Sequence, residues 1–194
     1  MTADQQQTDP ELLTQALAGR EDRFAELYGR RQGGVFRFAL QMSGSVAVAE
    51  DVTQETFLAL LTHGTRFDPA RGSVAAFLYG IARNVVLRRL EHERRFEQEE
   101  DSCADGDVLD DLTRSQSIER VREAVLCLPP VYREVIVLCD LQETSYEEAA
   151  TALACPIGTV RSRLNRGRAM LAQKLCITLS VSPCRERQTV RSLE

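Results

Sequence analysis

The sequence contains no tryptophan, only two histidines, and six cysteines scattered singly along its 194 residues. No two cysteines form a C-x-x-C pair, and His63 and His92 are remote from them in sequence, so the spacing typical of a zinc site is missing. A phosphate-binding glycine loop and a nucleophile–base constellation are also missing. These absences argue against an enzyme that uses cysteine or histidine chemistry, and we expect no catalytic residue, bound metal or cofactor.

The sequence also lacks a membrane span and an export signal. No apolar run approaches the roughly 20 residues needed to cross a bilayer. The first ten residues, MTADQQQTDP, lack the basic start and apolar core of a secretory signal, which predicts a cytoplasmic protein. Thiols stay reduced there, so the cysteines should have structural or incidental roles, although a redox or metal role stays open. Cys127 and Cys139 fall among apolar residues, where a free cysteine behaves as a small hydrophobic side chain.

Charge is segregated along the chain, although the net charge is −5. Residues 97–111 hold eight acidic residues and no basic one, whereas residues 71–95 hold six arginines against Glu91 and Glu93. Local fields matter more to a polyanionic partner than the total charge does. The acidic balance therefore does not exclude binding to nucleic acid.

The stretch from Ser145 to Leu175 predicts two short helices joined by a tight turn. Ser145 followed three residues later by Glu148 is a capping box that opens the first helix. The apolar face of this helix consists of Tyr146, Ala149, Ala150 and Leu153. Pro156 cannot continue the helix, and a second one is expected to start near Thr159. Its apolar stripe consists of Val160, Leu164, Leu171 and Leu175.

The outer face of the second helix is polar and basic. From Thr159 to Cys176 there are five basic residues and no acidic one. A basic helix after a tight turn suits the major groove of DNA, where central side chains reach base edges and flanking arginines anchor on phosphates. The candidate DNA-contacting residues are Arg161, Ser162, Arg163, Asn165, Arg166 and Arg168. The alternative is an amphipathic helical hairpin whose charged face is merely solvated.

The N-terminal half predicts four helices, over residues 9–18, 23–42, 47–62 and 74–95. Gly33-Gly34 are expected to break or kink the second of them. The third buries one face, formed by Ala49, Val52, Thr56, Phe57 and Leu60. Its other face carries an acidic stripe at helical spacing, formed by Asp51, Gln54, Glu55 and Leu58. A polar stripe is usually only solvated, but an acidic one that ends in an exposed leucine suits docking to a basic partner.

The fourth helix follows a turn-forming loop, FDPARGS, with Ser73 as its N-cap. The helix begins apolar and ends strongly basic, and aromatic side chains beside arginine and Asn84 are suited to holding unpaired bases. For Phe77 we favour the alternative that the ring belongs to the core.

The composition changes from Phe96 to about Ser115, where the chain is acidic and poor in large apolar residues. Helical periodicity resumes at Ile118. We therefore predict an all-α protein of two small helical domains joined by a flexible acidic linker, the second domain containing the helix-turn-helix. The expected parts are 1–95, the linker 96–116, 117–176 and a tail 177–194 to which no role is assigned.

Five motifs together resemble those of bacterial RNA polymerase sigma factors of the sigma-70 family, in the small extracytoplasmic-function (ECF) group. They are FAELYGR, AEDVTQETFLAL, FDPARGSVAAFLYGIARN, LPPVYREVIVL and SYEEAATALACPIGTVRSRLNRGRAML. Each is weak alone, but their order and spacing are specific, and the resemblance covers nearly all of residues 24–175.

The resemblance implies a DNA-binding factor that joins core polymerase, directs it to promoters, melts DNA and starts transcription. The stripe from Asp51 to Leu58 matches the segment with which such factors grip the coiled coil of the polymerase β′ subunit. The implied partners are the β′ and β subunits of core RNA polymerase, promoter DNA and an anti-sigma factor that covers the polymerase-binding surfaces. The acidic linker matches the segment that threads the polymerase channel where RNA will run.

The resemblance also implies two DNA-reading surfaces. The loop and helix after Phe67 match the part that captures a flipped base of the −10 element, where stacking offsets a few kcal/mol of unpairing. The implied −10 contacts are Arg71, Ser73, Arg83, Asn84, Arg88 and Arg89. The basic face of the second hairpin helix matches the −35 reading helix, in which Asn165 can pair with adenine. Phe77 stands where the family usually has tryptophan, and Arg88 where an acidic residue is common.

A stand-alone helix-turn-helix transcriptional regulator is the rival interpretation. It would bind DNA without polymerase, usually as a symmetric dimer, and it accounts for the second domain. It leaves the acidic stripe and the basic helix around Arg83 without a role. Stoichiometric binding to core polymerase separates the two interpretations, because only a sigma factor should show it.

Overall fold

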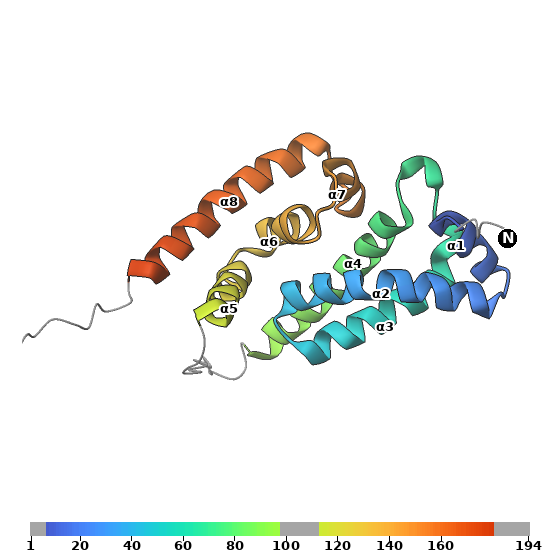
Figure 1. The fold of residues 1–194 in the computed structure, drawn as a ribbon, viewed down its shortest axis with the longest axis horizontal. Coiled ribbons are helices and arrows are strands. Elements are labelled where there is room, and N and C mark those ends of the chain that lie inside the picture. The colour runs from blue at the N-terminus through green and yellow to red at the C-terminus, as the bar shows by residue number, and fades with distance from the viewer. Residues whose placement is uncertain (1–6, 98–112, 181–194) are drawn as a thin grey trace, which may run out of the picture.

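The computed structural model describes residues 7–97 and 113–180, and every regular element in these ranges is helical. The first helical group consists of α1 (Asp9–Leu17), α2 (Glu21–Ser43), α3 (Val46–His63), the 3-10 turns η1 (Gly64–Arg66) and η2 (Pro69–Arg71), and α4 (Val74–Glu97). The second helical group consists of α5 (Thr113–Leu126), α6 (Pro130–Ile136), the π-helical turn η3 (Val137–Leu141), α7 (Tyr146–Ala152) and α8 (Ile157–Ser180). Figure 1 shows the two groups side by side. The predicted all-α fold class is confirmed.

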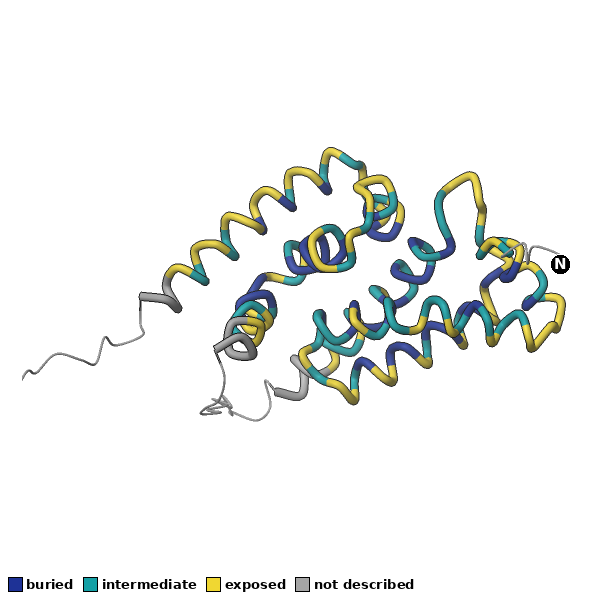
Figure 2. The backbone as a smooth tube through the Cα atoms, viewed as in Figure 1, coloured by how far each residue is buried: buried dark blue, intermediate teal, exposed yellow. Residues whose placement is uncertain are grey.

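The first helical group is built around an apolar core between α2, α3 and α4, with α1 packed against α2 at one end. Leu12, Phe38, Leu60 and Leu78, one from each helix, are at most 1% exposed. Burying a side chain of this size stabilises the fold by about 1.5–3 kcal/mol. Figure 2 shows buried positions on the helices' inward faces and exposed ones outside. The residues predicted to form the buried face of α3 are all buried.

The predicted break at Gly33-Gly34 is wrong, because α2 continues as one helix from Glu21 to Ser43. A Cβ atom added to Gly34 would lie 2.9 Å from the hydroxyl oxygen of Tyr79. The Tyr79 ring is itself buried against Phe38, with ring centroids 5.6 Å apart. The glycine therefore allows α4 to approach α2 closely and does not end the helix.

Two helices extend well beyond their predicted ends. Helix α5 begins at Thr113, ahead of the predicted Ile118, and α8 continues to Ser180, past the predicted end at 176. Both extensions are polar or weakly periodic, so the spacing of apolar residues could not reveal them. No proline stops α8 at its predicted end, since the first proline after the helix is Pro183. Most of the predicted acidic linker, 98–112, lies outside the described residues, as does the tail beyond 180.

The two helical groups pack against one another through what is called here the group interface. Helix α7 contacts α4, while α5, α6 and η3 contact α2, and one hydrophobic cluster includes buried residues of both groups. The fit is close, since a Cβ atom added to Gly44 of the α2 C-terminus would lie 2.9 Å from Cδ1 of Leu126. The sequence had given no indication of this contact.

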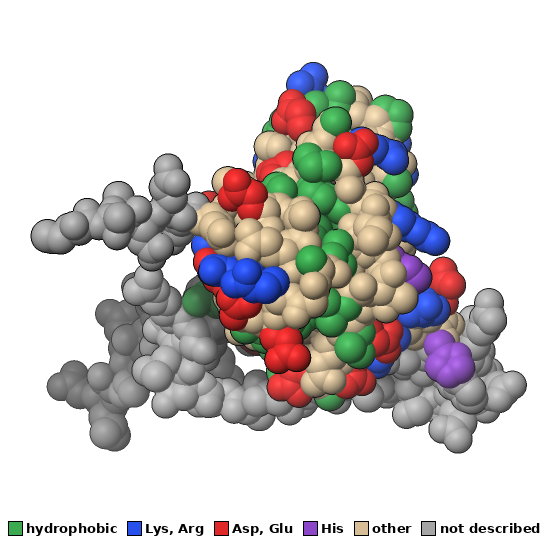
Figure 3. All heavy atoms as spheres, turned by 90° about the vertical axis from the view of Figure 1, so that its right-hand side faces the viewer, with side chains coloured by type: hydrophobic (Ala, Val, Ile, Leu, Met, Phe, Trp, Pro, Cys, Tyr) green, Lys and Arg blue, Asp and Glu red, His purple; other side chains and the backbone are tan. Residues whose placement is uncertain are grey.

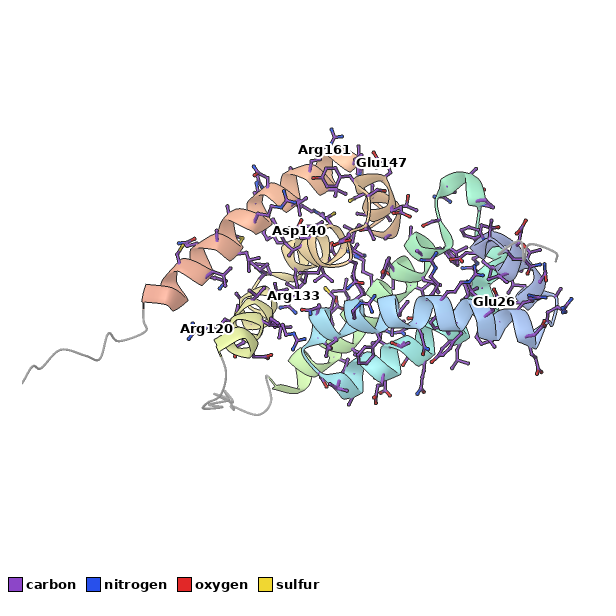
Figure 4. The ribbon with its side chains drawn as sticks, in the orientation of Figure 1. Glu26, Arg120, Arg133, Asp140, Glu147 and Arg161 are labelled. Carbon is purple, nitrogen blue, oxygen red and sulfur yellow. The ribbon has the colours of Figure 1, made fainter. Side chains whose placement is uncertain are left out.

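A buried arginine also joins the groups. The guanidinium of Arg133, on α6, donates to the carbonyl oxygen of Met42 in the last turn of α2 at 2.5 Å. It also donates to the carbonyl oxygens of Leu126 and Leu128, the latter at 3.0 Å. Figure 4 shows Arg133 between α5, α6 and α2. A cation at the carbonyl ends of two helices stabilises their dipoles, so Arg133 helps to fix the group interface.

Candidate polymerase and nucleic-acid interfaces

The acidic stripe predicted on α3 is formed in the structure. Asp51, Gln54 and Leu58 are exposed and Glu55 is half-buried, while the opposite face of the helix lies in the core. Leu58 is 64% exposed, the highest value among the large apolar side chains exposed in the described ranges. An exposed leucine beside carboxylates is suited to a partner that offers both apolar contact and positive charge.

Two arginines of α4 lie against this stripe. Arg89 donates to Asp51 at 2.8 Å and also to Glu55, and Arg88 donates to Glu55 at 3.3 Å. The carboxylates of Glu55 and then Asp51 raise the pKa of Arg89. Surface ion pairs of this kind contribute only about 0–1 kcal/mol, so these arginines can exchange partners readily. The structure therefore places Arg88 and Arg89, predicted as −10 contacts, at the edge of the α3 stripe.

The other four predicted −10 residues line a single cavity of about 290 Å³. Arg71 and Ser73 come from the loop before α4, and Arg83 and Asn84 come from α4 itself. The ring of Phe77 also lines the cavity and packs on Phe67, with ring centroids 5.7 Å apart. Phe77 is half-buried, so it belongs both to the edge of the core and to the cavity wall.

The predicted helix-turn-helix is formed by α7 and α8. The capping box is present, since the Glu148 amide donates to the Ser145 hydroxyl at 3.1 Å and the Ser145 amide donates to the Glu148 carboxylate at 3.3 Å. Ala154 reverses the chain with a φ of 49°, in the left-handed region, and α8 begins at Ile157. Tyr146 was predicted to be buried, which is wrong. It is 36% exposed, and the guanidinium carbon of Arg161 lies 5.9 Å from the centre of its ring.

The six candidate residues on α8 divide into two sets. Arg161, Ser162, Asn165 and Arg166 are exposed on one outer face, and Figure 4 shows Arg161 pointing outward beside the end of α7. The guanidinium groups of the other two are held by acidic residues of the same helical group. Arg163 donates to Glu134 at 3.3 Å, and Arg168 donates twice to Asp140, at 3.0 and 2.5 Å. The Asp140 carboxylate raises the pKa of Arg168.

Sequence reasoning missed the acidic partners of these arginines. Glu134 is only 1% exposed, and it lies within the apolar run VYREVIVL. A carboxylate in such a run is a signal that a buried cation pairs with it, because an unpaired buried charge is costly. Asp140 carries no comparable signal in the sequence.

The end of the molecule formed by α1 and the neighbouring helix ends has a mixed surface. Figure 3 looks onto this end and shows acidic, basic and apolar side chains interspersed among its described residues. A nucleic-acid surface normally gathers positive charge on one face. This end is therefore a poorer candidate for DNA binding than the cavity or α8.

The part of the chain that the structure describes contains no group of three or more His, Cys, Asp or Glu side chains suited to hold a metal ion, and none of its helices is long and apolar enough to cross a membrane. Cys139 is half-buried and packs against the hydrophobic core, whereas Cys127 is exposed, so the prediction that both behave as small hydrophobic side chains is wrong for Cys127. Burial, with a smaller contribution from Asp140, raises the pKa of the Cys139 thiol to about 11. Cys103 and Cys184 lie outside the described residues.

Cys139 should react far more slowly with iodoacetamide than Cys127 at pH 8. A thiol reacts as its thiolate, and a thiol whose pKa is raised to about 11 is only about one part in a thousand thiolate at that pH. Raising the pH toward 11 should therefore accelerate labelling of Cys139. Mass spectrometry of tryptic peptides over a time course measures both rates, and equal rates at pH 8 would contradict the assigned burial.

Two family models match the chain. Sigma-70 region 2 matches residues 27–96, and Sigma-70, region 4 matches residues 118–171. The first range includes the acidic stripe and the loop and α4 residues that line the cavity, and the second includes the helix-turn-helix. These matches define the class: the chain is a sigma-70-type DNA-binding transcription initiation factor.

Comparison with individual relatives shows to which group of sigma factors the chain belongs. The chain is 35% identical to the ECF RNA polymerase sigma factor EcfG of Rhodopseudomonas palustris over 72% of its own length and 78% of EcfG. It resembles the structure of CnrH in complex with the cytosolic domain of CnrY, with a TM-score of 0.69 and 28% identity over 87% of this chain and 97% of that one. It also resembles the sigma factor RpoE of Bartonella quintana in complex with the anti-sigma factor NepR, with a TM-score of 0.66 and 25% identity over 82% and 98% of the two chains. The chain belongs to the ECF RNA polymerase sigma factors.

Proposed function

We propose that this ECF sigma factor binds its partners through three separate surfaces and uses no catalytic chemistry of its own. The α3 stripe docks on the β′ coiled coil of core RNA polymerase, the cavity beside α4 captures an unpaired base of the −10 element, and the outer face of α8 reads the −35 element. The proposed parts are 1–95 and 117–176, joined by the acidic linker 96–116, and the second part also engages the polymerase β subunit. The place of action is the cytoplasm, where polymerase and chromosome meet.

The exposed stripe on α3 is the observation that carries this proposal. Three of its members are exposed, and Leu58 among them is 64% exposed. A stand-alone DNA-binding regulator has no use for such a surface on a helix away from its helix-turn-helix. A docking site for a much larger basic partner explains both the charge and the leucine.

The cavity beside α4 has the chemistry that an extruded base requires. Arg71, Ser73 and Asn84 offer hydrogen-bond groups around it, and the ring of Phe77 offers a face for stacking. Base capture needs polar groups for the base edge and an apolar or aromatic wall for its face. Phenylalanine supplies a smaller stacking surface than tryptophan, so stacking should contribute less here than in relatives that carry tryptophan.

The four exposed residues of α8 are the best candidates for reading the −35 element. Asn165 can bond adenine bidentately, and Arg166 can bond guanine in the same way. Arg163 and Arg168 are held by Glu134 and Asp140 and serve mainly to position α8. Ser162 donates to the Thr159 carbonyl at 3.0 Å and would need to turn to reach DNA.

An anti-sigma factor is a further proposed partner. The solved relative from Bartonella quintana is described in complex with the anti-sigma factor NepR. Its similarity to this chain extends over 82% of this chain. A protein that covered the α3 stripe would prevent polymerase binding.

Reconstitution with core polymerase tests the proposed function. The chain should form a one-to-one complex with core and produce transcripts from specific start sites on genomic DNA. Sequencing those transcripts identifies the promoter elements. Unchanged start sites with and without the chain, or tight promoter binding by a dimer without polymerase, would favour the stand-alone regulator instead.

Replacing Arg166 by alanine should weaken promoter binding by the holoenzyme by about 1–3 kcal/mol, because it removes one base-reading side chain. Binding to core polymerase should not change. Arg122→Ala is the matched control, since Arg122 is an exposed arginine of the same helical group that pairs with Glu119 on α5. Electrophoretic or fluorescence titration with a mapped promoter measures the effect, and a simultaneous loss of core binding would refute the assignment of α8 to DNA.

A further inference from the structure

A small cavity lies between α2, α4 and the residue that follows η3, and it is called here the α2 cavity. Its volume is about 220 Å³, and none of its lining residues belongs to the α3 stripe, to the cavity beside α4 or to the outer face of α8. No acidic residue of the described ranges lines it. Its polar wall consists of three arginines of α2, the hydroxyl of an α4 tyrosine and a side-chain amide, from Arg30, Arg31, Arg37, Tyr79 and Gln142.

The hydroxyl of Tyr79 is a buried donor whose capacity is poorly used. Tyr79 is only 8% exposed, and its hydroxyl donates one long hydrogen bond, 3.5 Å, to Oε1 of Gln142. Hydrogen bonds from a hydroxyl are normally about 2.7–2.8 Å long, and buried polar groups rarely lack a good partner. A Cβ atom added to Gly34 would lie 2.9 Å from the same oxygen, so glycine leaves the space beside this donor open.

The electrostatic field at this hydroxyl is positive. Burial raises the pKa of Tyr79, so the hydroxyl is protonated and can donate at neutral pH. Arg37 and Arg31 each act to lower that pKa, and both effects exceed the opposing effect of Glu148. An anion that accepts a hydrogen bond from Tyr79 is therefore stabilised by nearby positive charge.

Arg37 is the arginine of the wall that is available to a ligand. Arg30 and Arg31 are both paired with Asp9, and Arg30 is also paired with Glu26 at 2.5 Å. Arg37 is exposed, and no acidic residue within 7–97 or 113–180 forms an ion pair with it. A guanidinium in this state can donate two parallel hydrogen bonds to a phosphate group.

The shape of the α2 cavity limits what can enter it. Its other lining residues include Val35 and Leu78, which are at most 2% exposed, whereas Arg37 lies at the surface. The cavity is therefore closed on its inner side. Its volume is also below the roughly 300–1,000 Å³ of pockets that enclose a whole small-molecule ligand. A terminal phosphate can enter end on, whereas a phosphate within a nucleic-acid strand has a sugar on each side and would stay outside.

We propose that the α2 cavity binds the terminal phosphate or pyrophosphate group of a small anionic molecule. Arg37 and the hydroxyl of Tyr79 donate to phosphate oxygens, and the paired arginines add positive charge at the wall. The rest of the molecule remains outside the cavity. This site is additional to the proposed function and does not depend on it, because it shares no residue with the three surfaces assigned there.

The test is a titration of the full chain with sodium pyrophosphate at constant ionic strength, followed by the amide resonances in nuclear magnetic resonance spectra. Constant ionic strength is required because salt screens exposed charges. The amides of Gly34 and Gln142 should shift in a saturable manner that fits one site. Arg37→Gln and Tyr79→Phe should each weaken binding by about tenfold or more, because each removes a hydrogen bond in which one partner is charged.

Arg20→Gln is the matched control. It changes the net charge as Arg37→Gln does and removes an exposed arginine from the residue before α2, where Arg20 pairs with Asp22. It should bind pyrophosphate as the wild type does. Equal weakening in R20Q, or no saturable shift in the wild type at millimolar pyrophosphate, would overturn the site.

A competition experiment separates a free phosphate compound from nucleic acid. A single-stranded oligonucleotide without terminal phosphates should not displace pyrophosphate from the wild type. Displacement that is lost in R37Q would show that the cavity holds a backbone phosphate, and the proposal of a small ligand would be refuted. Circular dichroism confirms that the variants are folded, and R37Q, which alters an exposed side chain, decides the matter if Y79F is not.

Discussion

Replacing Asp51 and Glu55 together by arginine should abolish binding to core RNA polymerase, with a loss of affinity of about 100-fold or more. Both carboxylates lie on the outward face of α3, beside an exposed leucine. Bringing like charges together at an interface costs several kcal/mol, and each 1.4 kcal/mol is a factor of ten in affinity. Surface plasmon resonance with immobilised core polymerase measures the loss, and normal transcription by the variant would refute the docking face.

The ion pairs between α3 and α4 require a matched control. In the double variant, new arginines would face Arg88 and Arg89, and the resulting repulsion between the helices must be distinguished from lost docking. A fourfold variant that also replaces Arg88 and Arg89 by glutamate restores these pairs with reversed sign. It should melt close to the wild type and still fail to bind core. Recovery of core binding in this variant would show that the stripe acts only through α4.

The acidic stripe on α3 could be predicted from the sequence because the pattern that defines it is local. Asp51, Glu55 and Leu58 lie at helical spacing on a segment whose other face is apolar, and helical periodicity assigns each face without knowledge of the rest of the fold. The capping box at Ser145 is equally local, and the structure contains both of its hydrogen bonds. Local features of this kind do not depend on how the rest of the chain folds.

The state of the basic residues could not be predicted, because their partners are distant in sequence. Arg83 pairs with Glu134, 51 residues away, and Arg89 pairs with Asp51, 38 residues away. A list of arginines at helical spacing predicts a basic face, but only the packed fold shows which guanidinium groups an acidic residue already holds. Gly34 was misread for the same reason, since the tyrosine that requires it belongs to another helix.

Replacing Arg133 by methionine should lower the free energy of unfolding by about 3 kcal/mol, because hydrogen bonds from a charged donor contribute about 1.5–3 kcal/mol each. Methionine keeps most of the volume but leaves the carbonyl oxygens of Met42, Leu126 and Leu128 without this donor. Arg133 is only 9% exposed, so water cannot readily replace it. For a chain of this size the melting temperature should fall by about 6–12 °C.

Arg122→Met is the control that distinguishes the effect on stability of losing a buried arginine from the effect of losing a positive charge. Arg122 is 50% exposed and pairs with Glu119 on the surface of α5, so its replacement should change stability by less than about 1 kcal/mol. Thermal and urea unfolding followed by circular dichroism measures both variants. Because Met42 belongs to the first helical group and Arg133 to the second, the loss in R133M should affect the unfolding of both groups. Equal stabilities of the two variants would show that Arg133 does not fix the group interface.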